Sequence, residues 1–180
     1  KTIGVDATIA DAADIDLLMI LDTSAWQQLG AMRELIQSTT AQKIVLDHHV
    51  SLDELGATPF KNTSAEATGR LVVEAAEHLG VALTPAMAMP LFAAVATDTG
   101  WFRFNSTTPY TYEVAAKLVA AGANPTEIFK HLYEQDTLGR VRLRGRIFER
   151  FVTDLGGRLA HTFVRASDFA ETGAHPSDTE

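Results

Sequence analysis

The chain has 180 residues, of which 46% are hydrophobic and 21% are charged, and its formal net charge is −8. This composition indicates a folded domain rather than a disordered chain, and no apolar run approaches the ~18–20 residues that cross a bilayer. The absence of cysteine excludes disulfides, thiolate metal sites and a cysteine nucleophile, and it fits a cytoplasmic protein. The acidic charge argues against broad electrostatic binding to long nucleic acids.

Two short apolar runs, 16–21 and 43–46, predict strands that are buried on both faces. Between them, apolar residues recur every three or four positions from 26 to 38, which predicts a helix. A strand, a helix and a strand in this order form a βαβ unit with parallel strands. We therefore expect an α/β fold with a mainly parallel sheet flanked by helices.

The following residues predict several helices. Thr63 and Glu66 form a capping box for a helix that ends near Leu79, and Pro85 opens an apolar segment that Pro90 should kink or restart. Further helices are expected from Pro109 to about Gly122, from Pro125 onward and from Leu138 to about Val152, with short extended segments at 102–104 and 158–164.

Acidic residues and histidines follow the predicted strands. Asp22 ends the first apolar run, Asp47, His48 and His49 end the second, and Asp98 ends a later apolar segment. The carboxyl ends of parallel strands are where open α/β sheets bind ligands. Carboxylate oxygens mixed with imidazole suit Mn²⁺, Mg²⁺ or Fe²⁺, and two such ions can activate a water and neutralise a phosphoryl group.

Each of these residues also has an ordinary structural explanation. An aspartate at a strand end is often the N-cap of the next helix, a histidine pair is more often exposed than ligating, and a Thr-Asp-Thr-Gly sequence is frequently a turn. Their joint occurrence, each after an apolar segment, favours a metal site.

Three motifs in this order resemble a known family. The sequence 46–49 resembles the signature that names the DHH phosphoesterases, 20–23 resembles the acidic motif that precedes it, and 96–102 resembles the motif that follows it. The match extends through 62–68 and 132–135, so the resemblance spans roughly 17–151. It is closest to the small bacterial oligoribonucleases that also dephosphorylate phosphoadenosine phosphate, and it extends to exopolyphosphatase-related proteins.

The resemblance implies a role for each motif residue. Asp22 would bridge two Mn²⁺ ions, with Mg²⁺ or another divalent ion as a substitute, and His48 and Asp98 would complete the ligands of the second ion. His49 would face the phosphate or the attacking water, and Asp47 would orient the histidines. The implied substrate is a short oligonucleotide or a nucleotide. No membrane partner is expected, and a homodimer is one expected assembly.

The sequence departs from the family at both ends. No histidine precedes His48, so the family's first motif, a histidine followed by a pair of aspartates, has no match. The family's C-terminal substrate-binding domain is also absent beyond its beginning. We therefore expect 1–152 to be a partial catalytic domain with a linker helix and 153–180 to begin the missing domain. This truncated form is expected to be nearly inactive.

Cationic side chains near the motifs are candidate phosphate contacts. Arg103, together with Asn105, follows Asp98 closely, and we expect these two to bind substrate. A second group of arginines lies on the helix predicted from Leu138. These arginines are expected either to contact substrate phosphates or the missing domain, or to face solvent and pair with Glu149 or Glu134. The group consists of Arg140, Arg142, Arg144, Arg146 and Arg150.

The same motifs are also compatible with other functions. Family II inorganic pyrophosphatases, exopolyphosphatases and RecJ-type exonucleases share the motifs, but a pyrophosphatase should surround its small substrate with lysines and arginines, and no such set flanks these motifs. The negative net charge gives no support to a nuclease that acts on long single-stranded nucleic acids. A non-catalytic domain that senses a nucleotide or a metal is the alternative from a different class.

Overall fold

The structure is a computed structural model that describes residues 9–12, 14–51 and 53–179. The chain forms two compact units, residues 1–125 and 126–180. The first unit contains the predicted motifs and confirms the α/β fold, with a parallel sheet flanked by helices. The unit boundary lies within the predicted catalytic domain, 1–152, and the assignment of 153–180 to a further domain stays a prediction.

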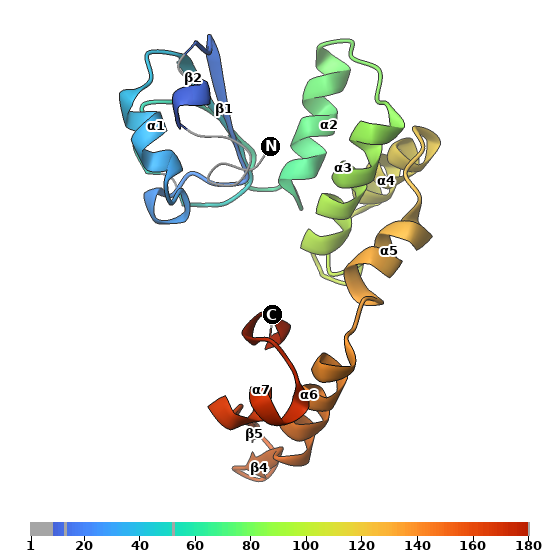
Figure 1. The fold of residues 1–180 in the computed structure, drawn as a ribbon. Coiled ribbons are helices and arrows are strands. Elements are labelled where there is room, and N and C mark those ends of the chain that lie inside the picture. The colour runs from blue at the N-terminus through green and yellow to red at the C-terminus, as the bar shows by residue number, and fades with distance from the viewer. Residues whose placement is uncertain (1–8, 13, 52, 180) are drawn as a thin grey trace. The chain divides into compact units, whose positions relative to one another are not determined.

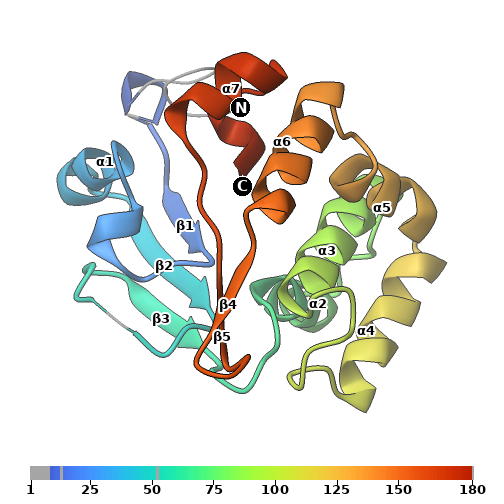
Figure 2. The same ribbon diagram turned by 90° about the horizontal axis from the view of Figure 1, so that it is seen from below.

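The sheet of the first unit has three parallel strands in the order β1 (Leu17–Leu21), β2 (Gln42–Asp47) and β3 (Thr58–Lys61). A 3-10 turn, η1 (Ile9–Ala12), precedes it. The predicted helix between β1 and β2 is split into η2 (Trp26–Gln28) and α1 (Met32–Ser38). These elements cover one face of the sheet (Figure 2), with a core of Ile20, Leu29, Ile36, Val45 and Leu55.

The opposite face of β1 is exposed in the described residues. Leu17, Met19 and Leu21 alternate with the core residues and are 47%, 50% and 46% exposed. Apart from its pairing with β2, β1 has no extensive contact with another described element. The prediction that this strand is buried on both faces is therefore wrong for the described structure, because α1 covers only one of them.

Three helices form a separate layer beside the sheet: α2 (Thr68–His78), α3 (Pro85–Asp98) and α4 (Pro109–Ala120) (Figure 1). The end of the predicted α4 is confirmed, and Thr108 caps its start by accepting a hydrogen bond from the Thr111 amide. Gly69 allows α2 and α3 to approach closely, since a Cβ there would lie 2.9 Å from the Cβ of Ala94.

The capping box predicted at Thr63 is wrong, because α2 begins at Thr68. The Asn62 side chain accepts hydrogen bonds from the Ser64 amide and hydroxyl at 3.1 and 2.7 Å, and such a local turn competes with helix formation. Glu66 does not cap the helix and instead contacts Arg70 at 3.0 Å.

Two further predictions in this layer are corrected. Helix α3 continues through Pro90 and does not restart there, because the carbonyl of Ala86, which loses its partner, belongs to an exposed residue and can bond to water. The segment 102–104 is a turn rather than an extended piece, because Trp101 and Phe102 have φ angles of 60° and 62°.

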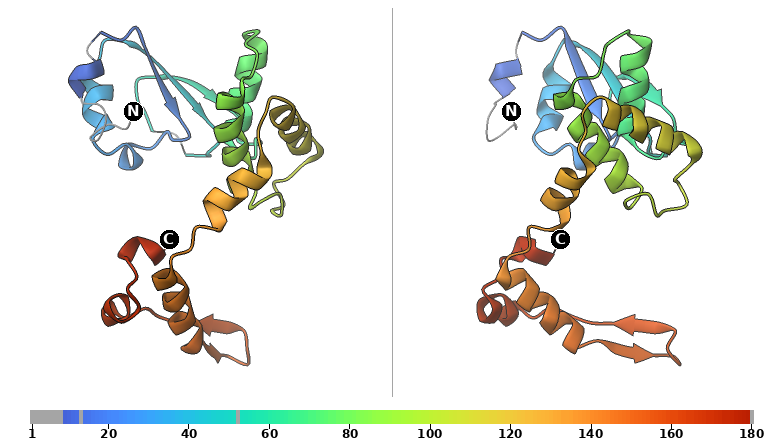
Figure 3. Two further views of the ribbon diagram at one scale, coloured as in Figure 1. Left: turned by 45° about the vertical axis from the view of Figure 1, so that its right-hand side comes forward. Right: turned by 90° about the vertical axis from the view of Figure 1, so that its right-hand side faces the viewer.

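The second unit begins within α5 (Pro125–Tyr133) and continues with α6 (Leu138–Glu149), which ends before the predicted Val152. The chain leaves α6 into an antiparallel hairpin of β4 (Val152–Asp154) and β5 (Leu159–His161) (Figure 3), so the strand predicted within 158–164 is confirmed. The last elements are α7 (Ala166–Thr172) and η3 (Pro176–Thr179).

Arginines of the predicted group have acidic partners within the second unit, and the charge of Glu149, one of the predicted partners, also acts on Arg150. Arg144 pairs with Asp136, and Arg146 pairs with Glu171 at 3.3 Å. Arg150 binds Asp168, whose side chain is 1% exposed. The hydrogen bonds that Arg150 and the Arg165 amide donate to Asp168 hold the pKa of this carboxyl group well below its ordinary value. These arginines therefore join α6 to its neighbours in this unit.

None of the described helices is both long enough and apolar enough to cross a membrane.

Candidate metal centre

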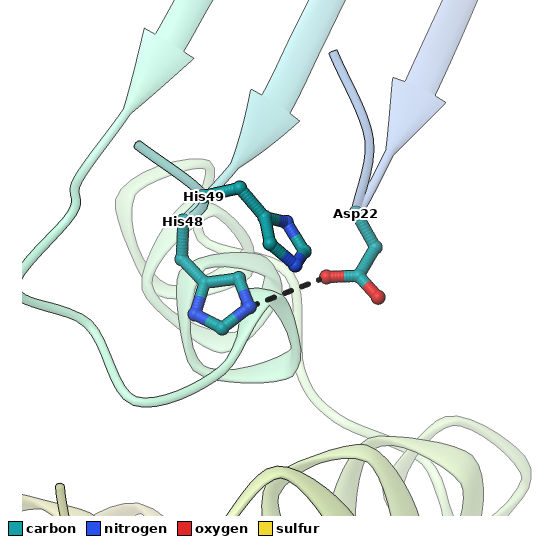
Figure 4. Close-up of side chains that lie close together, drawn as sticks. All are labelled: Asp22, His48 and His49. Carbon is teal, nitrogen blue, oxygen red and sulfur yellow. Dashed lines mark ion pairs between the residues drawn. The ribbon is translucent and has the colours of Figure 1, made fainter. Parts of the chain in front are cut away.

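Asp22, His48 and His49 meet at the carboxyl edge of the sheet, where β1 and β2 end side by side (Figure 4). One potential ligand atom from each residue lies within 4.8 Å of the others. The Nε2 atom of His48 is 3.6 Å from Oδ1 of Asp22. The parallel pairing of two adjacent strands explains this meeting, because it brings their carboxyl ends to one edge.

Asp98, the last residue of α3, lies beside the same group of side chains. Its Oδ2 atom is 3.6 Å from the Nε2 atom of His48, so this nitrogen lies near two carboxylates. Burial, followed by the negative charge of Asp22, raises the pKa of Asp98, although the two histidines oppose the shift. A cation between these carboxylates would relieve their repulsion.

Both histidines direct Nε2 toward the site because their Nδ1 atoms are engaged elsewhere. The Nδ1 of His48 lies 3.1 Å from the carbonyl oxygen of Ala65, and since a carbonyl can only accept, this nitrogen must carry the proton. The Nδ1 of His49 lies 2.7 Å from Oδ1 of Asp47. A neutral imidazole with a protonated Nδ1 presents an Nε2 lone pair, which is the form that binds metals.

Asp47 is fully buried beneath the site and orients His49. Burial alone would raise the pKa of Asp47, but hydrogen bonds from Ser24, His49 and Lys61 outweigh it and hold this pKa well below its ordinary value. The carboxylate is therefore ionised and accepts from His49. The sequence-based expectation that Asp47 would orient both histidines needs correction, because the Ala65 carbonyl holds His48.

Asp22 adopts a left-handed backbone conformation, with φ of 64°, while its amide bonds to the Leu46 carbonyl at 3.1 Å. Side chains with a Cβ are strained in this region.

We expect Asp22→Gly to be more stable to unfolding than Asp22→Ala by about 1 kcal/mol, because both remove the same charge and only alanine retains the strain. Urea unfolding in the presence of EDTA measures the difference. Equal stability of the two variants would show that the strain is absent.

The donor set fits a divalent cation. Two imidazole nitrogens and the carboxylates of Asp22 and Asp98 combine the ligand types that Mn²⁺ and similar ions accept. A cavity of about 250 Å³ adjoins Asp22 and Asp98, and α2 and α3 line it mainly with apolar side chains. The cavity leaves room for part of a ligand next to the group.

The structure does not bring every predicted residue to this group. Arg103 is exposed, and its Nε donates to the Gly100 carbonyl at 2.7 Å. Asn105 is also exposed, and no described contact links either residue to the histidines. Their role in binding substrate stays a prediction. Ser24, Lys61 and the Ala65 carbonyl contact the motif residues but were not predicted, because no spacing in the sequence indicates a contact that depends on tertiary folding.

Comparison with known proteins agrees with the motifs. No family model matches the sequence. The chain is 28% identical over 166 residues to the bifunctional oligoribonuclease and PAP phosphatase NrnA of Bacillus subtilis, covering 90% of this chain and 51% of that protein. It is 33% identical over 116 residues to the protein of the same name from Thermus thermophilus, covering 64% of this chain and 36% of the relative.

A solved structure shares the fold over nearly the whole chain. The exopolyphosphatase-related protein of Bacteroides fragilis superposes with a TM-score of 0.90 at 20% identity, covering 96% of this chain and 51% of that one. The chain thus spans about half the length, or less, of these relatives. The motifs, the fold and these similarities relate the chain to the DHH-family phosphoesterases, with low sequence identity to the NrnA oligoribonucleases and a fold shared with the exopolyphosphatase-related protein.

Proposed function

We propose that the protein is a divalent-metal-dependent phosphoesterase that hydrolyses short oligonucleotides, nucleotide phosphomonoesters such as phosphoadenosine phosphate, or both. The observation that carries the proposal is the convergence of Asp22, His48 and His49, with ligand atoms within 4.8 Å of one another. Hydrogen bonds to Ala65 and Asp47 prepare both imidazoles to present Nε2. A structural or solvent-exposed histidine pair would not need this arrangement.

In the proposed site each residue has a distinct task. Asp22, His48 and Asp98 hold the metal, for which Mn²⁺ is our first choice, and when bound it supplies Lewis-acid stabilisation to the phosphoryl group. His49 lies beside these ligands, where it faces the phosphate or the attacking water, and Asp47 keeps its ring in place. The sheet and α3 thus position the ligands before the substrate arrives.

The proposed substrate class rests on the relatives and on the charges around the site. Two relatives are named for oligoribonuclease and PAP phosphatase activity. Two of the described cations near the motif residues are already paired with carboxylates, since Lys61 contacts Asp47 and Arg70 contacts Glu66 and Glu74. A small, highly charged substrate such as pyrophosphate would need free cations, so a substrate with fewer phosphates and an organic moiety is favoured.

The test is release of mononucleotide by the full-length protein from a 5′-labelled di- or trinucleotide, with phosphoadenosine phosphate, pyrophosphate and polyphosphate assayed in parallel. The proposal predicts hydrolysis of the oligonucleotide or of phosphoadenosine phosphate that requires Mn²⁺ or a similar ion. Hydrolysis of pyrophosphate or polyphosphate alone would overturn the substrate class. Metal binding without hydrolysis of any of these compounds would indicate a sensor domain instead of an enzyme.

A further inference from the structure

A buried network lies behind His49, on the side away from the candidate metal ligands. Asp47 accepts hydrogen bonds on both of its oxygens: Oδ1 from the His49 amide at 3.1 Å and from the His49 Nδ1 at 2.7 Å. Its Oδ2 accepts from the Ser24 hydroxyl at 2.7 Å and lies 3.1 Å from the Lys61 ammonium. The orientation of the carboxylate is therefore set jointly by His49 on one oxygen and by Ser24 and Lys61 on the other.

Lys61 is well placed to restrain this carboxylate. It is the last residue of β3, directly opposite Asp47 in the parallel register, and its side chain is 13% exposed. Its Nζ also donates to the Ser24 hydroxyl at 2.8 Å and to the Ser51 carbonyl. An ammonium group has three protons, and these three acceptors use all of them. A lysine bound on three sides has little freedom to move.

Lys61 is the common partner of the groups that surround Oδ2 of Asp47. The Ser24 hydroxyl has one proton, for which Oδ2 of Asp47 and the Ser51 carbonyl at 2.6 Å compete. Lys61 contacts all three of these groups, so it is the common partner that keeps Oδ2 fixed whichever acceptor the hydroxyl chooses. Fixing Oδ2 also fixes Oδ1, because the two oxygens belong to one planar group, and Oδ1 holds the His49 ring.

We propose that Lys61 is a positioning residue of the site, which acts through Asp47 to hold the His49 ring with Nε2 directed toward the metal ligands. The expected change in kcat rests on the proposed function, whereas the expected change in the His49 ring does not. Partners of metal-binding histidines typically change metal affinity or activity by about 10- to 100-fold when removed. Lys61 is one contact farther away, and we expect an effect near the lower end of this range, about 10-fold.

The test compares Lys61→Met with Lys43→Met in the full-length protein. Methionine keeps the length of the side chain and removes its charge and donors. Lys43 is a matched control, since it lies on the neighbouring strand β2, where its Nζ donates to the Ile36 carbonyl at 3.1 Å and contacts none of the motif residues. The imidazole ¹H–¹⁵N spectrum of the metal-free protein, at one fixed pH, reports the Nδ1–H bond of His49. Mn²⁺ affinity and kcat are measured alongside.

We expect Lys61→Met to weaken or broaden the His49 Nδ1–H signal and to lower Mn²⁺ affinity or kcat about 10-fold, while Lys43→Met resembles the wild type. A His49 signal and an Mn²⁺ affinity that both match the wild type would overturn the positioning role. If Lys61→Met does not fold, Lys61→Gln replaces it, because it also removes the ammonium group that faces Oδ2 of Asp47 while keeping a polar side chain. An unchanged signal there would likewise overturn the inference.

The two proposals fail in different ways. A wild-type protein that hydrolyses no phosphoester would overturn the proposed function, whereas the His49 signal would still report whether Lys61 controls the ring. Conversely, Mn²⁺-dependent hydrolysis that is unaffected by Lys61→Met, together with an unchanged His49 signal, would leave the proposed function intact and remove Lys61 from it.

Discussion

Replacing His48 with alanine is expected to reduce Mn²⁺-dependent phosphoester hydrolysis by at least about 1,000-fold, which corresponds to the several kcal/mol of transition-state stabilisation that a bound metal supplies. The Nε2 atom of His48 lies 3.6 Å from carboxylate oxygens of both Asp22 and Asp98, so the substitution removes the nitrogen that lies near both carboxylates. Steady-state hydrolysis of a labelled dinucleotide by the full-length protein measures the loss.

His78→Ala is the matched control for this experiment. His78 lies in the same unit near the end of α2, and its Nδ1 contacts a backbone carbonyl of its own helix, that of Glu74, at 2.8 Å. We expect this variant to retain wild-type activity. A His48→Ala protein as active as His78→Ala would contradict the proposed metal site, provided that both variants give the same circular dichroism spectrum.

Replacing Asp47 with alanine is expected to lower the free energy of unfolding by about 3–5 kcal/mol, the typical result of removing one partner from a buried ion pair. Asp47 is fully buried, and Lys61, 3.1 Å from Oδ2, would keep its charge without a compensating carboxylate. Ser24 and His49 would lose acceptors as well. Urea unfolding followed by tryptophan fluorescence measures the change, since Trp26 lies near this part of the fold and packs against its core.

Two further variants identify the source of this effect. Glu54→Ala removes an exposed carboxylate from the same stretch of chain and should change stability by less than about 0.5 kcal/mol. Asp47→Ala combined with Lys61→Met should recover part of the stability lost in Asp47→Ala, because no uncompensated charge remains. A double variant that is less stable by the sum of the two single changes would show that the two groups do not interact.

The elements that were predicted correctly are those whose cause is local. Apolar runs predicted β1 and β2 and their parallel pairing, and Thr108 with Pro109 marked the start of α4. Strand β3 was not predicted, because it has only four residues and contains Pro59, and its pairing with β2 supplies what its own sequence lacks. Helix α2 was placed too early because the Asn62 turn holds the preceding residues.

The residues of the candidate site also differ in how far the sequence predicts their contacts. Asp22 and His48 could be brought together from sequence, because the rule for adjacent strand ends depends only on the order of the elements. Asp98 was identified by its motif, and the structure places it beside His48 from a helix rather than from a strand. The contacts of Ser24 and Lys61 with Asp47 join residues 23 and 14 positions apart in the chain, and they depend on the register of three strands.

Anomalous diffraction from crystals of the full-length protein grown with Mn²⁺ tests whether these side chains hold a metal. We predict an anomalous peak within coordinating distance of Nε2 of His48 and of carboxylate oxygens of Asp22 and Asp98, and its loss in His48→Ala crystals. Crystals that diffract well and contain Mn²⁺ elsewhere, but show no peak at this position, would contradict the assignment of the site and the hydrolytic function proposed for it.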